Sequence, residues 1–244
     1  MNPSAYLEMA RTESEHWWFV GRRQIIASVL SRLFPSDKID VLEVGCGTGG
    51  NLAMLSEFGL VTAVEKNSWA AEYTRDRMDI RANVLSADFL ELDFADRKFD
   101  LICAFDVLEH LPDDVDALQR MAEMLADNGR ILVTVPAYQW LWSNHDRKLH
   151  HYRRYNRNEL IGKINQLPLK IELISYFNFL LFPLSVCLRG LDAILVKDWS
   201  SQTSHVSGFL NTILLKMFSA ERLLLRHARL PFGLSLLVVL RNPL

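Results

Sequence analysis

Glycines gather at one point of the chain, in the sequence VGCGTGG that follows a short apolar run. A glycine-rich turn bends the backbone sharply and lets a ligand approach the main chain closely. Gly45, Gly47 and Gly50 have the GxGxxG spacing of dinucleotide-binding turns. A second set, with Gly49 in place of Gly50 and with Glu43 ahead of it, has the spacing ExGxGxG. Either spacing indicates a nucleotide or nucleoside, and a tight turn without any ligand is the alternative.

Three acidic residues follow the glycines, each after an apolar run short enough to be a strand. Glu65 lies 20 residues beyond Gly45, where a carboxylate can accept hydrogen bonds from both ribose hydroxyls of a nucleoside. Asp88 can accept a hydrogen bond from the exocyclic amine of adenine while Phe89 packs on the ring. Asp106 lies in FDVLEH, at the end of a run where ligands bind in open α/β sheets. Each acid could instead be a solvated loop residue.

Histidines and basic residues are dense further along the chain. His145, His150 and His151 lie close together, and histidine is the usual general base near neutral pH. Five Lys/Arg residues fall between Arg147 and Arg157 in a chain of net charge −2, which favours an acceptor with a phosphate, pyrophosphate or carboxylate group. A solvated loop is the alternative. We expect no metal, because the flanking cations oppose a dication and the spacing matches no zinc motif.

An aromatic and basic segment, HWWFVGRR, lies near the start of the chain at residues 16–23. Arg22 or Arg23 could pair with the carboxylate of a bound ligand, and Trp18 could cover that ligand. Packing of the aromatic side chains on the core is an equal alternative.

Short apolar runs alternate with helical patterns, which predicts βαβ units. The expected strands cover residues 40–44, 60–65, 83–86, 99–105 and 130–135, with two further runs at 170–176 and 234–240. The expected helices are one that Pro35 ends, one after Gly50, one over 70–78, and one from 115 that Asn128-Gly129 stops. The predicted fold class is therefore α/β and Rossmann-like, with a mostly parallel sheet and helices on both faces.

Residues 35–140 resemble a class I S-adenosylmethionine-dependent methyltransferase, of the small-molecule type that includes the quinone-biosynthesis methyltransferases. The matching segments are LEVGCGTGG, AVEKN, ADF, FDLICAFDVLEHLPD and LADNGRILVTVP. The resemblance implies S-adenosylmethionine as the cofactor, with its methionine and ribose beside residues 45–47 and its ribose diol on Glu65. It also implies adenine on Asp88 and Phe89, the methionine end above Asp106, and an antiparallel last strand.

These observations predict three sets of site residues. The cofactor-binding set is Trp18, Arg22, Arg23, Glu43, Gly45, Cys46, Gly47, Thr48, Gly49, Glu65, Lys66, Asp88, Phe89 and Asp106. The candidate catalytic bases are His150 and His151, followed by His145 and His110. The expected substrate-binding residues are Tyr138, Trp142, Arg153 and Arg154. The expected reaction is methyl transfer to an oxygen of a small-molecule or lipid-linked, anionic acceptor.

Two other functions stay open. An NAD(P)-dependent oxidoreductase shares the fold, although none of the six tyrosines has a lysine four residues on, as a short-chain enzyme would need. A non-catalytic, cofactor-binding regulatory protein would carry the same binding residues. Nucleic acid is not expected as a partner, because the Asn/Asp-Pro-Pro-aromatic motif of amino-methylating DNA enzymes is missing and the basic patch is short.

Composition and segment pattern set the expected organisation. Half of the 244 residues are hydrophobic and 23% are charged, which is an ordinary globular balance. The three cysteines are far apart and no signal-peptide pattern begins the chain, so we expect a reducing, cytoplasmic location.

The length fits one methyltransferase domain, 1–244, with an elaboration. Its expected parts are an N-terminal cap (1–34), a cofactor-binding core (35–140), an acceptor-side loop and strand (141–176), an apolar helical insert (177–232) and a last strand (233–244). The insert holds two apolar helical patterns around a polar patch, and the second is amphipathic. It could be a lid of ordinary core helices, or an in-plane contact with the inner face of a membrane.

Overall fold

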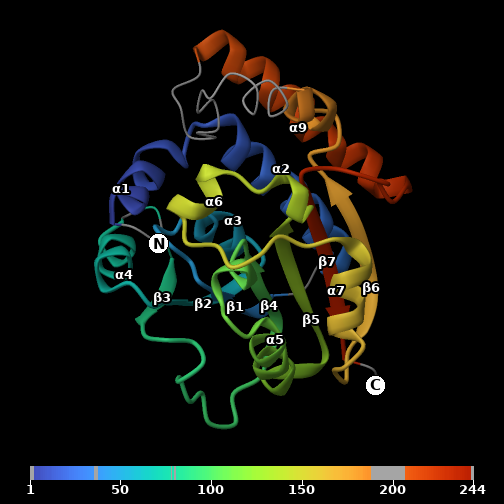
Figure 1. The fold of residues 1–244 in the computed structure, drawn as a ribbon. Helices are drawn as coiled ribbons and strands as arrows, with labels where there is room; N and C mark the ends of the chain where they lie inside the picture. Colours follow the sequence, from blue (N-terminus) through green and yellow to red (C-terminus); the bar gives the residue numbers. More distant parts are fainter. Residues whose placement is uncertain (1–2, 36–37, 78, 80, 188–206, 243–244) are drawn as a thin grey trace.

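The computed structural model describes residues 3–35, 38–77, 79, 81–187 and 207–242. Within these residues, seven strands form one sheet in the order β3-β2-β1-β4-β5-β7-β6 (Figure 1). The strands are β1 (Ile39–Val44), β2 (Gly59–Glu65), β3 (Ala82–Ser86), β4 (Phe99–Phe105), β5 (Leu125–Pro136), β6 (Lys170–Phe177) and β7 (Ser235–Arg241). The first five pair in parallel, whereas β7 runs antiparallel to both β5 and β6.

The sheet confirms the predicted α/β, Rossmann-like fold with an antiparallel last strand. Every expected strand is present, and all but β5 begin and end within one residue of the predicted bounds. The apolar runs predicted these strands well because the central strands are covered on both faces. In β4, for example, Leu101, Ile102 and Cys103 are all fully buried. Strands buried on both faces are expected to be almost continuously hydrophobic.

The start of β5 differs from the prediction. We expected Asn128-Gly129 to stop the preceding helix, but that helix ends at Glu123 and β5 already begins at Leu125. The register with β4 shifts between Phe99 and Leu101, so residues before Arg130 form a bulge. A Cβ on Gly129 would lie 2.9 Å from the Phe99 carbonyl oxygen, so this glycine serves a close backbone approach within the sheet.

Helices fill the connections between strands. They are α1 (Pro3–Thr12), α2 (Trp17–Leu33), α3 (Leu52–Ser56), α4 (Ser68–Arg75), α5 (Asp114–Glu123), α6 (Asn144–Lys148), α7 (Arg157–Ile164) and α9 (Gly208–His227). Side chains cap several N-termini: Asn67 accepts from Ala70 N, and Asn156 accepts from Glu159 N. Two short 3-10 turns, Leu108–His110 and Gln139–Leu141, follow β4 and β5. The polar stretch that forms α1 had given no helical signal.

The helices form layers around the sheet. α5 and α7 pack together beside β5 and β6, in front of the sheet in Figure 1, and α2 packs against α3 with α9 outside it. Ile25, Ile26 and Leu30 of α2 are fully buried in the core. The apolar spacing that predicted this helix therefore marks its core-facing side.

The insert predicted at 177–232 is only partly described. Its second helical pattern is confirmed as α9. Most of the first pattern, and the polar patch up to 206, lie outside the described residues. Among the described helices, none combines the length and the hydropathy that crossing a bilayer requires.

Candidate active site

A cavity of about 1060 Å³ opens where the carboxyl ends of β1, β2, β4 and β5 meet. This edge of an open parallel sheet is where ligands bind in such folds. The cavity brings together the predicted glycine turn, the three acids and the four candidate histidines. Six predicted site residues do not line it: Glu43, Thr48, Gly49, Tyr138, Trp142 and Arg153.

The glycine turn has the geometry of the ExGxGxG pattern. Gly45, Gly47 and Gly49 have φ of +69°, +57° and +85°, and Gly50 is not among the positive-φ glycines. Residues with a side chain rarely adopt this left-handed backbone. In addition, a Cβ on Gly45 would lie 2.7 Å from Val107 Cγ2. The turn is therefore built for glycine at 45, 47 and 49, and Gly50 has another role.

The variant Gly45→Ala is expected to lower the free energy of unfolding by about 2–3 kcal/mol, through left-handed backbone strain and overlap with Val107. Urea unfolding followed by circular dichroism would measure the loss. Gly162→Ala is the matched control, because nothing lies within 4 Å of a Cβ there in α7. It should raise stability by about 0.5–1 kcal/mol. Equal stability of the Gly45→Ala variant and wild type would contradict this account of the turn.

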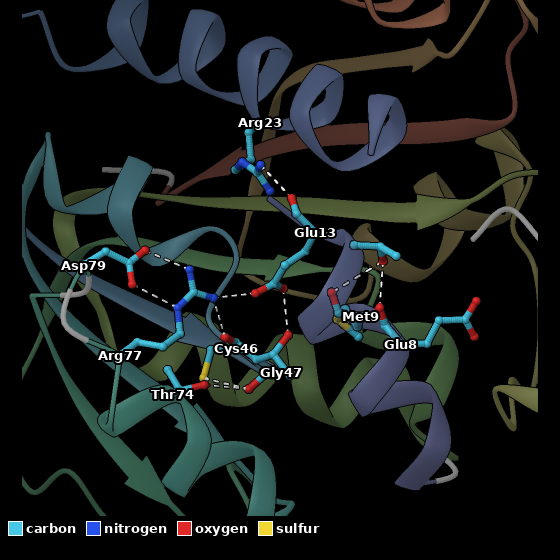
Figure 2. Close-up of polar contacts among 11 residues, drawn as sticks. Glu8, Met9, Glu13, Arg23, Cys46, Gly47, Thr74, Arg77 and Asp79 are labelled. Atoms are coloured by element: carbon cyan, nitrogen blue, oxygen red, sulfur yellow. Dashed lines mark hydrogen bonds and ion pairs between the residues drawn. The ribbon is translucent and has the colours of Figure 1, made fainter. Parts of the chain in front are cut away.

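Glu13 explains why position 50 is glycine. Its carboxylate accepts from Thr48 Oγ1 at 2.7 Å, and a Cβ on Gly50 would lie 2.5 Å from Glu13 Oε2. Figure 2 shows Glu13 between the turn and Arg77, with which it forms an ion pair. In dinucleotide-binding folds, the pyrophosphate lies at the start of the helix that follows this turn. The Glu13 carboxylate lies at this position, where its charge is paired with Arg77.

The predicted ribose acid, Glu65, points into the turn and is buried. Its Oε2 accepts from Gly47 N at 2.9 Å, which joins the acid to the glycine turn. Its Oε1 accepts from Asn67 N at 2.8 Å and from the hydroxyl of Tyr6 at 3.0 Å. The first helix, α1, therefore reaches across the cavity to the acid at the end of β2.

The other two acids also hold donors from the chain. Asp88 pairs with Lys66 Nζ at 2.5 Å; burial alone would raise the pKa of Asp88, but this hydrogen bond helps to hold it below its ordinary value. Asp106, which has a left-handed φ of +55°, forms an ion pair with Arg22. The Arg22 guanidinium lies 4.5 Å from the centre of the Trp18 ring. The start of α2 therefore covers the end of β4.

Several predicted residues lie elsewhere. Glu43 is buried beneath the turn, where its Oε1 accepts from Asn51 Nδ2 at 2.8 Å and burial raises its pKa to about 8. Tyr138 stacks on Tyr176 with ring centres 5.1 Å apart. Arg153 forms an ion pair with Asp114, at 2.9 Å. These side chains support the walls of the cavity and the loops around it.

The four candidate histidines all line the cavity. His110 and His151 lie edge to face with ring centres 4.5 Å apart, and His145 lies 6.5 Å from His151. Burial, and then the neighbouring His151, lower the pKa of His110 to about 3, so that this ring is neutral. His150 also lines the cavity, with a left-handed φ of +57°.

Asp146 orients His151. Its Oδ1 lies 2.9 Å from His151 Nδ1, and Arg154 holds the same carboxylate through Nε at 2.7 Å and Nη2 at 3.0 Å. Asp146 is fully buried and also accepts from Ser143 N, which completes a capping box for α6. Burial alone would raise the pKa of Asp146, but the hydrogen bonds from His151 and Arg154 hold it well below its usual range. An ionised carboxylate therefore fixes the imidazole.

Glu109 completes a possible metal-ligand group. The ligand atoms of Glu109, His110 and His151 lie within 4.8 Å of one another. Burial, and then Asp106, raise the pKa of Glu109 well above its usual range, while Arg154 and Arg22 act in the opposite sense. These two guanidinium groups oppose a dication, so the absence of a metal stays a prediction.

Adding one equivalent of Zn²⁺ to protein dialysed against EDTA is expected to leave the melting temperature unchanged, because Arg154 and Arg22 repel the ion near Glu109. Differential scanning calorimetry measures this directly. A rise of more than about 3 °C, which corresponds to a substantial binding energy, would contradict the prediction.

Sequence reasoning missed Tyr6, Glu13, Glu109 and Asp146 as site residues. The pattern Ser143-x-x-Asp146 is a capping-box signature and could have drawn attention to Asp146. Tyr6 and Glu13 lie in a polar stretch with no motif, and only the folded chain places them against the turn.

The fold is that of the class I methyltransferases. A sequence profile described as a methyltransferase domain matches residues 19–177, which is well over half of the chain. The chain belongs to this methyltransferase-domain family, which confirms the resemblance seen in its motifs. We therefore set aside the NAD(P)-dependent oxidoreductase, the enzyme class that the GxGxxG spacing also allowed.

Relatives with known names support the same class. A probable S-adenosylmethionine-dependent methyltransferase of Mycobacterium tuberculosis is 31% identical over 150 residues, covering 60% of this chain and 53% of the relative. A chloroplastic tocopherol O-methyltransferase of Arabidopsis thaliana is 28% identical over 176 residues, covering 67% of this chain and 47% of the relative. The chain thus spans about half the length of these relatives.

Solved structures share the fold. The plantazolicin methyltransferase BpumL, solved in complex with SAH (S-adenosylhomocysteine), has a TM-score of 0.60 and 15% identity, covering 98% of this chain and 88% of that chain. At this identity the likeness shows the fold alone.

Proposed function

We propose that this chain transfers the methyl group of S-adenosylmethionine to an oxygen of an anionic small-molecule or lipid-linked acceptor. One observation carries the proposal: a single cavity is lined by the glycine turn, by Glu65 and by His151, whose ring is paired with Asp146. A relative named as an O-methyltransferase supports an oxygen target.

The cofactor end fits an adenosyl ligand. The left-handed glycines at 45 and 47 leave the main chain open to a ligand, and Glu65 stands beside them as an acceptor for a ribose diol. Asp88 and Phe89 lie at the next strand end, where adenine would be held. Each acid already holds a donor of this chain, so Tyr6, Lys66 and Arg22 would have to share or release them.

His151 is the base in this proposal. When bound, the sulfonium supplies an already activated methyl group. Because Asp146 is ionised and faces Nδ1, it favours a proton on Nδ1 and leaves Nε2 of a neutral His151 to accept the acceptor's hydroxyl proton. Asp146 then stabilises the imidazolium, and Arg154 keeps Asp146 in place. The walls align the reactants and exclude water.

Cationic side chains support an anionic acceptor. Lys148 and Arg23 both line the cavity. Neither forms an ion pair with a carboxylate in the described part of the chain. Lys148 can therefore pair with a carboxylate or phosphate group of the acceptor, and Arg23 with the carboxylate of the cofactor. If the acceptor is lipid-linked, the segment 177–232 would contact the inner face of the membrane that holds the acceptor.

Mass spectrometry of small molecules retained by the purified protein tests the proposal. We expect S-adenosylmethionine or its demethylated product. A retained nicotinamide dinucleotide, with neither of these, would contradict the proposal.

A further inference from the structure

Arg77, in the segment that follows α4, lies next to the glycine turn without lining the cavity. Its Nη1 donates both to Glu13 Oε1 and, at 2.9 Å, to the Thr48 carbonyl oxygen. Asp79 accepts from the Nε and Nη2 atoms of the same guanidinium, at 3.1 and 2.8 Å. The rigid, planar guanidinium can make these bonds together, so one side chain ties the glycine turn to the beginning of the chain.

Glu13 is the other half of this contact. Its side chain is only 3% exposed, and its Oε2 accepts from Thr48 Oγ1 at 2.7 Å. The Glu13 carbonyl oxygen accepts from Arg23 Nη2 of α2 at 2.8 Å, as Figure 2 shows. Removing the cation from a buried ion pair leaves an uncompensated charge. The position of Glu13 against the turn therefore depends on Arg77.

Thr48 lies between two left-handed glycines, Gly47 and Gly49. Gly47 N donates to Oε2 of Glu65, the predicted ribose acid, at 2.9 Å. Glycine loses more conformational freedom than any other residue when its backbone is fixed. A turn with this many glycines needs contacts that hold it, and Thr48 receives them at both its side chain and its carbonyl oxygen.

The same contact keeps α1 over the turn. α1 ends one residue before Glu13, whose N donates to the Met9 carbonyl oxygen at 2.8 Å. The sulfur of Met9 would lie 3.5 Å from a Cβ on Gly47, and the Tyr6 hydroxyl donates to Glu65 Oε1. Loss of the contact at Glu13 therefore loosens α1 where it meets the two residues expected to hold the cofactor.

We infer that Arg77 is a positioning residue for the cofactor, because through Glu13 and Thr48 it fixes the glycine turn in the conformation that binds S-adenosylmethionine. The inference rests on the proposed function, which places the cofactor at this turn. Holding a loop in its bound conformation strengthens binding by lowering the cost of ordering it. A purely structural ion pair is the alternative, and it would change the stability of the protein without changing the affinity of the folded protein.

Isothermal titration calorimetry with S-adenosylhomocysteine tests the inference. Arg77→Met removes the guanidinium and should raise the dissociation constant about tenfold or more. Arg77→Lys restores a cation and should recover part of the loss. Arg130→Met is the matched control, because Arg130 also forms an ion pair, with Glu172 at 2.9 Å, is 25% exposed against 21% for Arg77, and does not line the cavity. It should bind like wild type.

A double-mutant cycle shows whether Arg77 acts through Glu13. If Arg77→Met and Glu13→Gln each weaken binding about tenfold, independent effects multiply to about 100-fold in the double variant. We expect the double variant to bind within about threefold of the weaker single variant, because both substitutions break the same contact. Amide hydrogen exchange without ligand is a second readout, and residues 45–51 should exchange faster in Arg77→Met than in wild type.

Three results would overturn the inference. The first is an Arg77→Met variant that binds within about twofold of wild type, and the second is a double variant with the full product of the two single losses. The third is unchanged hydrogen exchange at residues 45–51. Thermal unfolding of each variant verifies that it is folded at the temperature of the titration. Wild-type protein that does not bind S-adenosylhomocysteine would instead contradict the proposed function, whereas each of the three results leaves wild-type binding intact.

Discussion

Replacing Glu65 with glutamine is expected to weaken the binding of S-adenosylhomocysteine about 100-fold. The carboxylate would accept charge-assisted hydrogen bonds from the ribose hydroxyls, each contributing about 1.5–3 kcal/mol. Glutamine keeps the shape but presents an amide N–H where Gly47 N or Asn67 N already points at the side chain. Isothermal titration calorimetry of wild type and variant measures the dissociation constants.

The variant Tyr6→Phe is the matched control for this measurement. It removes one hydroxyl that donates to the same carboxylate and leaves the acceptor atoms of Glu65 intact. We expect its affinity to stay within a few-fold of wild type. Undiminished binding by Glu65→Gln would exclude the acid from the ribose site. Equal losses in both variants would instead locate the effect in the contact between α1 and β2.

The variant His151→Ala is expected to lower kcat by about 10²- to 10⁴-fold, which is the usual contribution of a positioned general base. The affinity for S-adenosylhomocysteine should change less than a few-fold, because the ring of His151 contacts Asp146, His110 and His145 rather than the residues predicted to bind the cofactor. Phenolic carboxylates and aryl phosphates with a free hydroxyl serve as probe acceptors. The rate is followed as S-adenosylhomocysteine released.

The variant His150→Ala separates the two neighbouring histidines. His150 lines the same cavity, whereas His151 is paired with the buried Asp146. We expect His150→Ala to keep most of the wild-type turnover. A kcat that survives in His151→Ala, or that falls equally in both variants, would place the base elsewhere.

The glycine turn illustrates the limit of a motif. The residues allowed both GxGxxG and ExGxGxG, because a string of letters carries no φ angle. The folded backbone separates the two, since Gly49 and not Gly50 has the left-handed conformation. The reason for Gly50 lies with Glu13, which is 37 residues earlier in the chain and becomes a neighbour only in the folded protein.

The loop with His145, His150 and His151 shows that sequence alone could not identify the catalytic base either. Its composition placed several possible bases side by side and gave no ground for choosing one. The choice follows from Asp146, which is buried and fixed by Arg154 and Ser143, and which is paired with His151.

Local pattern was enough to predict the strands, four of the helices between them and the acids at the strand ends, but not α1, α6 or α7. Apolar runs and turn residues act between near neighbours in the chain, so the letters alone specify them. The contacts of Tyr6 with Glu65, of Glu13 with the turn and of α9 with α2 join segments that are tens to nearly two hundred residues apart. Such contacts depend on how the layers pack, and that packing fixed which carboxylates are shared and which histidine is oriented.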